Sequence, residues 1–77
     1  MNALSKIESI LFVASKPLSF KIIARAIGKN ETETEELVKT LKMKYNQTES
    51  GIIIMQDGDE VQMATSPINI DVVESFV

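Results

Sequence analysis

The segment 51–65, GIIIMQDGDEVQMAT, places the tightest constraint on how this chain folds. It contains two runs of strand-favouring residues that flank Asp57-Gly58-Asp59, a sequence typical of a tight hairpin turn. The turn can centre on Asp57-Gly58 or on Gly58-Asp59, and both registers give the same two faces because strand side chains alternate. We expect one face to close a core. The two faces carry Ile52, Ile54, Val61 and Met63, and Ile53, Met55, Gln62 and Ala64, respectively.

Two helical segments are predicted near the start of the chain. Apolar residues recur at helical spacing from Leu4 to Ser15, and Pro17 disfavours a helical conformation at the residue before it. A second helix is expected over Phe20–Ile27, because Ser19 is a good N-cap and Gly28 favours a left-handed stop.

A third helix is predicted over Glu33–Tyr45. Thr32 and Glu35 match the S/T-x-x-E pattern of a capping box, and the glutamates of the first turn suit the helix dipole. The predicted buried stripe of this helix comprises Thr34, Leu37, Val38, Leu41 and Tyr45.

Ser66-Pro67 ends the second strand, and residues 68–77 have the spacing of a further amphipathic helix. The order helix, short helix, helix and hairpin predicts an α+β fold of the winged-helix type. It would have a three-helix helix-turn-helix core, a β-hairpin wing and the start of a further helix at the C-terminus. We expect residues 1–77 to form a single winged-helix domain. Because the sequence stops inside an apolar helical pattern, we interpret the chain as a fragment of a longer protein.

Catalytic chemistry is not expected from this composition. The chain has no histidine and no cysteine, so it lacks the commonest general base and the usual zinc ligands. Asp57, Asp59 and Glu60 cluster at the hairpin tip without the spacing of a calcium loop. We therefore predict no enzymatic activity, no cofactor and no metal site. The apolar run Ile10–Ala14 is far too short to span a bilayer, so no membrane segment is expected.

The charges are distributed unevenly along the chain. Residues 1–30 carry five bases and one acid, whereas residues 45–77 carry six acids and no base. A DNA-binding winged-helix transcriptional regulator is therefore the alternative function. Its candidate DNA contacts are Lys16, Lys21, Arg25 and Lys29.

Direct DNA binding is disfavoured by the charges of the expected reading helix and wing. The helix begins with four glutamates between Glu31 and Glu36, and the wing carries acids and no base. These acids would lie near phosphate groups, where like charges lower the affinity.

Protein contact is the function that the residues favour. A domain of this size is marginally stable alone and commonly gains stability by oligomerising. Several apolar residues exceed the needs of one small core and indicate a surface for self-association or for a partner. The candidate protein-interface residues are Phe12, Val13, Met43, Ile53 and Met55.

The order of these motifs resembles one known family. Ile10-Leu11-Phe12-Val13 in the first helix, Pro17-Leu18-Ser19 before the second, the strand Gly51–Met55 and the closing Thr65-Ser66-Pro67 occupy corresponding places in the segregation and condensation protein B (ScpB) family. The resemblance covers essentially the whole chain. The segment GDEVQMAT departs from the family, which often has an aromatic residue and an arginine in this strand.

The resemblance implies a function as well as a fold. The chain would be the first of two tandem winged-helix domains, a non-catalytic adaptor and homodimerisation module of a bacterial chromosome condensation and segregation complex. Its partners would be a second copy of itself, the kleisin subunit segregation and condensation protein A (ScpA) and, through the kleisin, the structural-maintenance-of-chromosomes (SMC) ATPase. The protein would be cytoplasmic and associated with the nucleoid.

Overall fold

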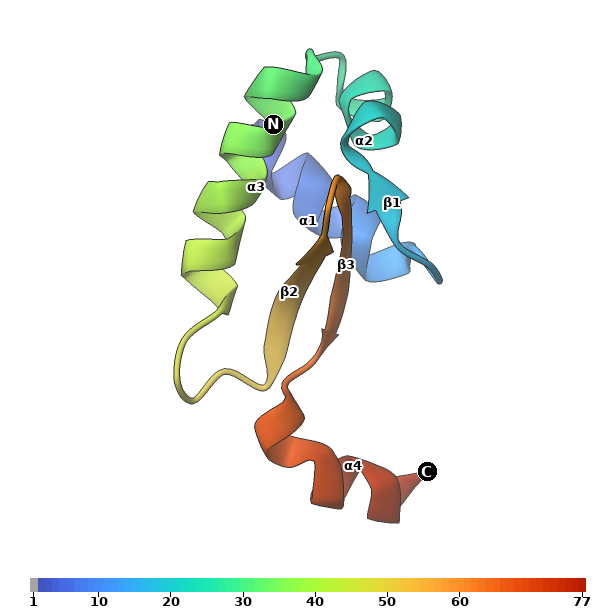
Figure 1. Ribbon diagram of the computed structural model, residues 1–77, viewed down its shortest axis with the longest axis vertical. Helices are drawn as coiled ribbons and strands as arrows, with labels where there is room; N and C mark the ends of the chain where they lie inside the picture. The colour runs from blue at the N-terminus through green and yellow to red at the C-terminus, as the bar shows by residue number, and fades with distance from the viewer. Residues whose placement is uncertain (1) are drawn as a thin grey trace.

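The protein folds as a winged helix in a computed structural model that describes residues 2–77 (Figure 1). The predicted α+β class is confirmed, and the helical part is followed by the hairpin and then by a C-terminal helix. In chain order the elements are α1 (Ala3–Val13), β1 (Leu18–Ser19), α2 (Phe20–Ile27), α3 (Glu31–Tyr45), β2 (Ile52–Asp57), β3 (Glu60–Thr65), the 3₁₀ turn η1 (Pro67–Asn69) and α4 (Ile70–Phe76).

The sheet has three antiparallel strands in the order β1-β3-β2. The hairpin turn centres on Gly58-Asp59, and Gly58 has a φ of 63°, which suits glycine at the first central position of a two-residue turn. Both predicted faces of the hairpin are confirmed, since Ile54 pairs with Met63 and Met55 pairs with Gln62. The short strand β1 is absent from the sequence prediction. Two residues are too few to show the alternation of apolar and polar side chains that marks a strand. The strand forms only because β3 lies beside it.

Helix α1 ends two residues earlier than predicted. It begins after Asn2, whose side chain accepts a hydrogen bond from the Ser5 amide at 2.8 Å, and its last residue is Val13 rather than Ser15. Ala14 already has the extended conformation, with φ −72° and ψ 134°. The chain must straighten here in order to reach β1, where Leu18 pairs with Val61.

The predicted capping box of α3 is wrong. The helix begins at Glu31, and its N-cap is Asn30, whose Oδ1 accepts from the Glu33 amide at 2.7 Å. The Glu33 carboxylate accepts in return from the Asn30 amide at 3.3 Å. Thr32, the predicted cap, lies in the first turn. The physical reason is the tight connection after α2, where Gly28 ends that helix in the left-handed conformation with φ 73°, as predicted.

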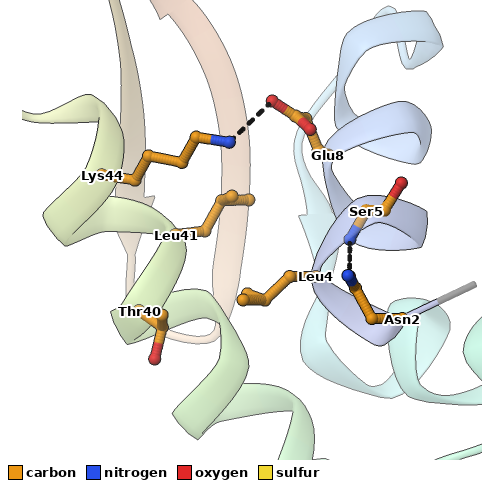
Figure 2. A pocket seen from close by; sticks show the side chains of 7 residues that line it. All are labelled: Asn2, Leu4, Ser5, Glu8, Thr40, Leu41 and Lys44. Atoms are coloured by element: carbon orange, nitrogen blue, oxygen red, sulfur yellow. Dashed lines mark hydrogen bonds and ion pairs between the residues drawn. The ribbon is translucent and has the colours of Figure 1, made fainter.

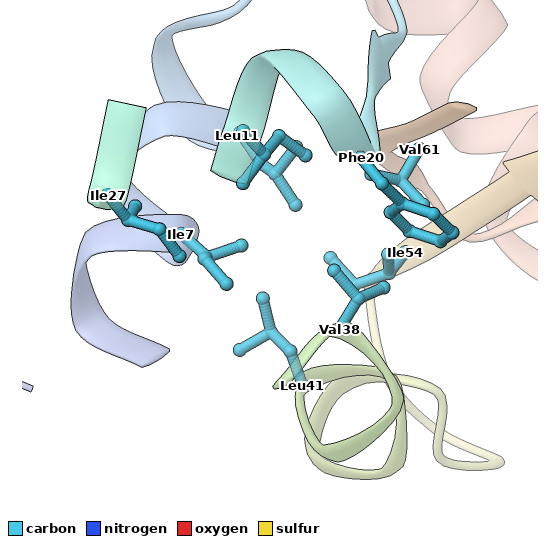
Figure 3. Close-up of a cluster of buried hydrophobic side chains, with 9 residues drawn as sticks. Ile7, Leu11, Phe20, Ile27, Val38, Leu41, Ile54 and Val61 are labelled. Atoms are coloured by element: carbon cyan, nitrogen blue, oxygen red, sulfur yellow. The ribbon is translucent and has the colours of Figure 1, made fainter. Parts of the chain in front are cut away.

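One apolar core joins the three helices to the hairpin (Figure 3). The predicted stripe of α3 is buried at Thr34, Val38 and Leu41 and half-buried at its other two positions. Full burial of one such apolar side chain contributes about 1.5–3 kcal/mol relative to exposure, so this cluster holds the helices on the sheet. Its members are Ile7, Leu11, Phe20, Ile23, Ile27, Val38, Leu41, Ile54 and Val61.

The free edge of the sheet is covered by the residue after α3. The Asn46 side chain accepts from the Ile54 amide at 2.8 Å and donates to the Ile54 carbonyl at 3.0 Å, as a neighbouring strand would. This pairing blocks the middle of the β2 edge against addition of another strand.

Helix α4 extends away from the core. It leaves β3 through η1 and lies at one end of the molecule, beyond the hairpin (Figure 1). None of its residues is buried, and Val72 and Phe76 are 63% and 89% exposed.

We predict that Asn30→Ala destabilises the fold by about 1 kcal/mol, because it removes the side-chain acceptor that caps α3. Thr32→Ala is the matched control and should leave the stability within about 0.5 kcal/mol of the wild type. Chemical denaturation followed by circular dichroism measures both variants. A larger loss for Thr32→Ala than for Asn30→Ala would contradict this assignment of the cap.

Candidate protein-interaction surfaces

The end of α1 carries two large apolar side chains that the core does not cover. Phe12 and Val13 are 77% and 78% exposed, since they lie on the side of the helix away from buried Ile7 and Leu11. Exposure of adjacent large apolar groups is costly in water and commonly marks a contact surface. Both residues are thus exposed, as a contact surface requires, and their role in an interface stays a prediction.

Two neighbouring hollows flank Phe12. One lies between α1, the end of α3 and the sheet, and is lined by Glu8, Ser9, Phe12, Val13, Tyr45 and Met63. The other is lined by Leu11, Phe12, Ile52, Met63, Ala64 and Thr65. Phe12 and Met63 line both hollows, so the two adjoin each other. We call Phe12, Val13, Ile52 and Met63 together the Phe12 surface.

Ile52 and Met63 belong to this surface although the sequence assigns them to the core face of the hairpin. Ile54 and Val61 on the same face are 2% and 0% exposed, whereas Ile52 is 38% exposed. The helices bury the middle of this face at Ile54 and Val61. Met63 is half-buried at the edge of the core, and Ile52 remains partly exposed. The alternation of the strands correctly predicts the face, but only the tertiary structure shows how far along the face the helices reach.

The other predicted interface residues lie apart from the Phe12 surface. Met43 is 74% exposed on α3, and Met55 is 48% exposed on the opposite face of the sheet, in a shallow hollow that Pro17 and Gln62 also line. Ile53 is half-buried. The structure therefore divides the predicted set in three: Phe12 and Val13 at the end of α1, Ile53 and Met55 as neighbours on the other face of the sheet, and Met43 on α3.

A polar cluster fixes α1 against the end of α3 beside the Phe12 surface. The Tyr45 hydroxyl donates a hydrogen bond to the Glu8 carboxylate, and Lys44 Nζ lies 3.8 Å from Glu8 Oε2. Figure 2 shows the Glu8–Lys44 ion pair at the rim of a small hollow between the two helices. Lys44 Nζ also lies 5.8 Å from the centre of the Tyr45 ring. The hydrogen bond to Glu8, with smaller contributions from burial and from the negative charge of Glu8, raises the pKa of Tyr45 above its usual value.

The candidate DNA-contacting residues are all exposed at the basic end of the chain. Lys21 and Arg25 lie on the outer face of α2, Lys29 follows that helix and Lys16 precedes β1. All four glutamates at the start of α3 are exposed, as are Asp57, Asp59 and Glu60 at the wing tip. The wing tip and the first half of the helix that reads DNA in a helix-turn-helix protein are therefore acidic on their outer surfaces here, whereas the second half of that helix carries Lys39, Lys42 and Lys44.

Among residues 2–77, no group of side chains is arranged to hold a metal ion. Within the same range, no helix combines the length and apolar character needed to cross a bilayer.

The elements and their packing define a winged-helix domain, with exposed acids at the start of α3 and uncovered apolar side chains at the end of α1. The chain belongs to the family of the segregation and condensation complex subunit ScpB, whose family model matches residues 5–77. The resemblance found in the sequence is thereby confirmed.

Relatives and solved structures agree with this family. The chain is 37% identical over 73 residues to segregation and condensation protein B of Caldanaerobacter subterraneus subsp. tengcongensis, covering 95% of the chain and 44% of that protein. The Carboxydothermus hydrogenoformans protein of the same name is 36% identical over 67 residues, which cover 87% of the chain and 36% of that protein. The chain thus spans less than half the length of these curated relatives.

A crystal structure of a dimer of the ScpB N-terminal domain complexed with ScpA peptide matches with a TM-score of 0.88 and 25% identity, covering 97% of this chain and 94% of that one. ScpB from Mycobacterium tuberculosis has the same fold, with a TM-score of 0.87 at 19% identity over 99% of this chain and 49% of that one.

We predict that Glu8→Gln lowers the pKa of Tyr45 toward its usual value, because the variant removes the charged acceptor of the tyrosine proton. Tyr45 is the only tyrosine and the chain has no tryptophan, so an ultraviolet titration of tyrosinate reports on this one group. Ser9→Ala is the control and should leave the titration unchanged.

The same hydrogen bond gives an alkaline dependence of stability. Its contribution is fully present below the unfolded pKa of tyrosine, about 10, and is lost as the pH rises through the higher folded value. The stability difference between the wild type and Tyr45→Phe should therefore shrink over that window. A difference that stays constant there would contradict the role given to Glu8.

Proposed function

We propose that this domain is a non-catalytic adaptor of a bacterial chromosome condensation and segregation complex. It forms a homodimer, binds the kleisin subunit ScpA and is linked through the kleisin to the SMC ATPase. The observation that carries the proposal is membership of the ScpB family together with the likeness to an ScpB N-terminal-domain dimer that holds an ScpA peptide.

The charges of the domain support protein contact rather than base reading. The exposed glutamates of α3 and the acids of the wing tip would face phosphate groups in a helix-turn-helix complex, where they would be repelled. The domain therefore keeps the winged-helix architecture without the basic reading surface that DNA requires.

The Phe12 surface is the place where we expect the kleisin to bind. Phe12 and Val13 project from the end of α1 beside hollows whose floor is apolar at Met63 and Ile52. An apolar segment of the kleisin would cover these side chains and fill the hollows, and an aromatic residue at the centre of such a surface usually dominates the binding energy. The β2 edge is a poorer site because Asn46 already occupies it at Ile54.

The expected wider context follows from the family. The domain would be the first of two winged-helix domains in a longer protein that works in the cytoplasm at the nucleoid. The short span of the chain relative to its relatives is compatible with that organisation.

Phe12→Ser should weaken binding of the ScpA encoded by the same genome by about tenfold to a hundredfold, since it removes the apolar centre of the proposed site. Met43→Ser is the matched control, because Met43 is equally exposed but lies on α3 away from that surface. Isothermal titration calorimetry measures both variants, and circular dichroism checks their folding. Unchanged binding by Phe12→Ser would remove the Phe12 surface from the proposal.

Duplex DNA should bind the domain weakly and without sequence preference. A fluorescence anisotropy titration with a labelled duplex across a salt series tests this expectation. Specific binding below about 1 μM at physiological salt would instead support the transcriptional regulator with contacts from Lys16, Lys21, Arg25 and Lys29.

A further inference from the structure

The outer face of α2 combines basic and apolar side chains. Lys21 and Arg25 are one helical turn apart, and Ile22 and Ala26 run beside them on the same exposed side. Ile22 is 51% exposed. Across residues 2–77, the ion pairs join Lys39 to Glu36 and Lys44 to Glu8, so neither base of this face is paired with an acid. We call Lys21, Ile22, Arg25 and Ala26 the α2 face.

Helix α4 has the complementary chemistry. At 100° per residue, Asp71 and Glu74 fall on one side of the helix, and the apolar residues occupy the remainder. Both acids are exposed. The exposed apolar residues of this segment are Ile70, Val72, Phe76 and Val77.

The α2 face and α4 cannot meet within one molecule. Glu60, the first residue of β3, pairs with Ser19, which is the N-cap of α2. The six residues of β3 then carry the chain about 20 Å along the sheet before η1 and α4 begin. Figure 1 shows α2 and α4 toward opposite ends of the longest axis of the molecule. A second copy is needed to bring the two surfaces together.

We propose that α4 of one copy packs on the α2 face of a second copy, and that the second copy returns the same contact. Asp71 and Glu74 would face Lys21 and Arg25, while Ile70 and Val77, which border these acids on the helix, would cover Ile22 and Ala26. This inference rests on the homodimer of the proposed function and names the surface that forms it. Because α2 and α4 lie toward opposite ends, two copies placed side by side and antiparallel form both contacts at once, which closes the assembly as a dimer.

In a twofold dimer the contact between α4 and the α2 face forms twice, so the dimer is more stable than a single such contact would make it. The second contact doubles the buried area, and stable interfaces typically bury about 1,600 Å² in total. The contact also covers the apolar residues of α4 that border the acids, which the rest of the molecule leaves in water.

DNA is the other possible occupant of the α2 face, and two observations argue against it. Ile22 and Ala26 gain nothing from phosphate, whereas an amphipathic helix covers them. The exposed glutamates of α3 begin only four residues after α2 ends, so a DNA backbone along α2 would approach an acidic helix.

A charge-exchange experiment tests the proposal in three steps. Lys21→Glu with Arg25→Glu makes the α2 face acidic, and Asp71→Lys with Glu74→Lys makes α4 basic. Each double variant is prepared alone, and the two are then mixed in equal amounts. Light scattering and sedimentation velocity measure the mass over a concentration range, and circular dichroism checks that each variant is folded. Lys39→Glu with Lys42→Glu on α3 is the control for a reversal of two charges elsewhere.

We expect each double variant alone to dimerise about a hundredfold more weakly than the wild type, because like charges then face each other at both contacts. The mixture should regain the wild-type affinity as a heterodimer, since its acidic α4 meets a basic α2 face and its basic α4 meets an acidic one. The α3 control should dimerise as the wild type does.

Other outcomes overturn the inference in distinguishable ways. If both double variants remain dimers of wild-type affinity, the homodimer of the proposed function stands and its contact lies elsewhere. If the wild type itself is a monomer at high micromolar concentration, the homodimer and the inference both fail. If Lys21→Glu with Arg25→Glu leaves the mass unchanged but abolishes binding of a labelled DNA duplex, the α2 face is a nucleic-acid contact and the inference is wrong.

Discussion

The packing of three helices against one side of a small sheet is the constraint on which the rest of the structure depends. Ile7 and Leu11 of α1 meet Ile54 and Val61 of the hairpin in one buried cluster (Figure 3). A chain of 77 residues buries only about 60% of the surface that it exposes when unfolded, so a single core cannot cover all of its apolar residues. The Phe12 surface and α4 are what this core leaves uncovered, and both are therefore available for association.

Charge decides what kind of association the domain favours. A winged helix that reads DNA needs bases on its third helix and wing, but here the acids that cap and follow the start of α3 are exposed. The same glutamates stabilise the helix by facing the positive end of its dipole. A feature that stabilises the helix locally thus also repels phosphate. On α2, by contrast, the two bases Lys21 and Arg25 are exposed with apolar residues beside them.

Much of the fold was predictable because its signals are local. Ser19 accepts from the Ile22 amide at 3.1 Å and Gly28 adopts the left-handed conformation, since caps act within a few residues of themselves. The sequence-based predictions were wrong where a contact between distant parts of the chain determines the local structure. Asn30 rather than Thr32 caps α3 because of the tight turn after α2, and β1 forms only because β3 lies beside it. Of the candidate surface, the sequence points to Phe12 and Val13. It places Met63 correctly on the core face, but it does not show that Ile52 and Met63 also line the hollows beside Phe12.

The sequence by itself determined the order of the elements, the two faces of the hairpin, the absence of histidine and cysteine chemistry, and the gradient from basic to acidic charge. These properties depend on residue type and on spacing along the chain, which need no knowledge of distant contacts. Only the tertiary structure decided which apolar residues remain in water and which surfaces adjoin. The burial of a residue depends on which other elements pack against it. No local sequence pattern therefore shows which sheet residues the helices bury, or that α2 and α4 lie toward opposite ends of the molecule.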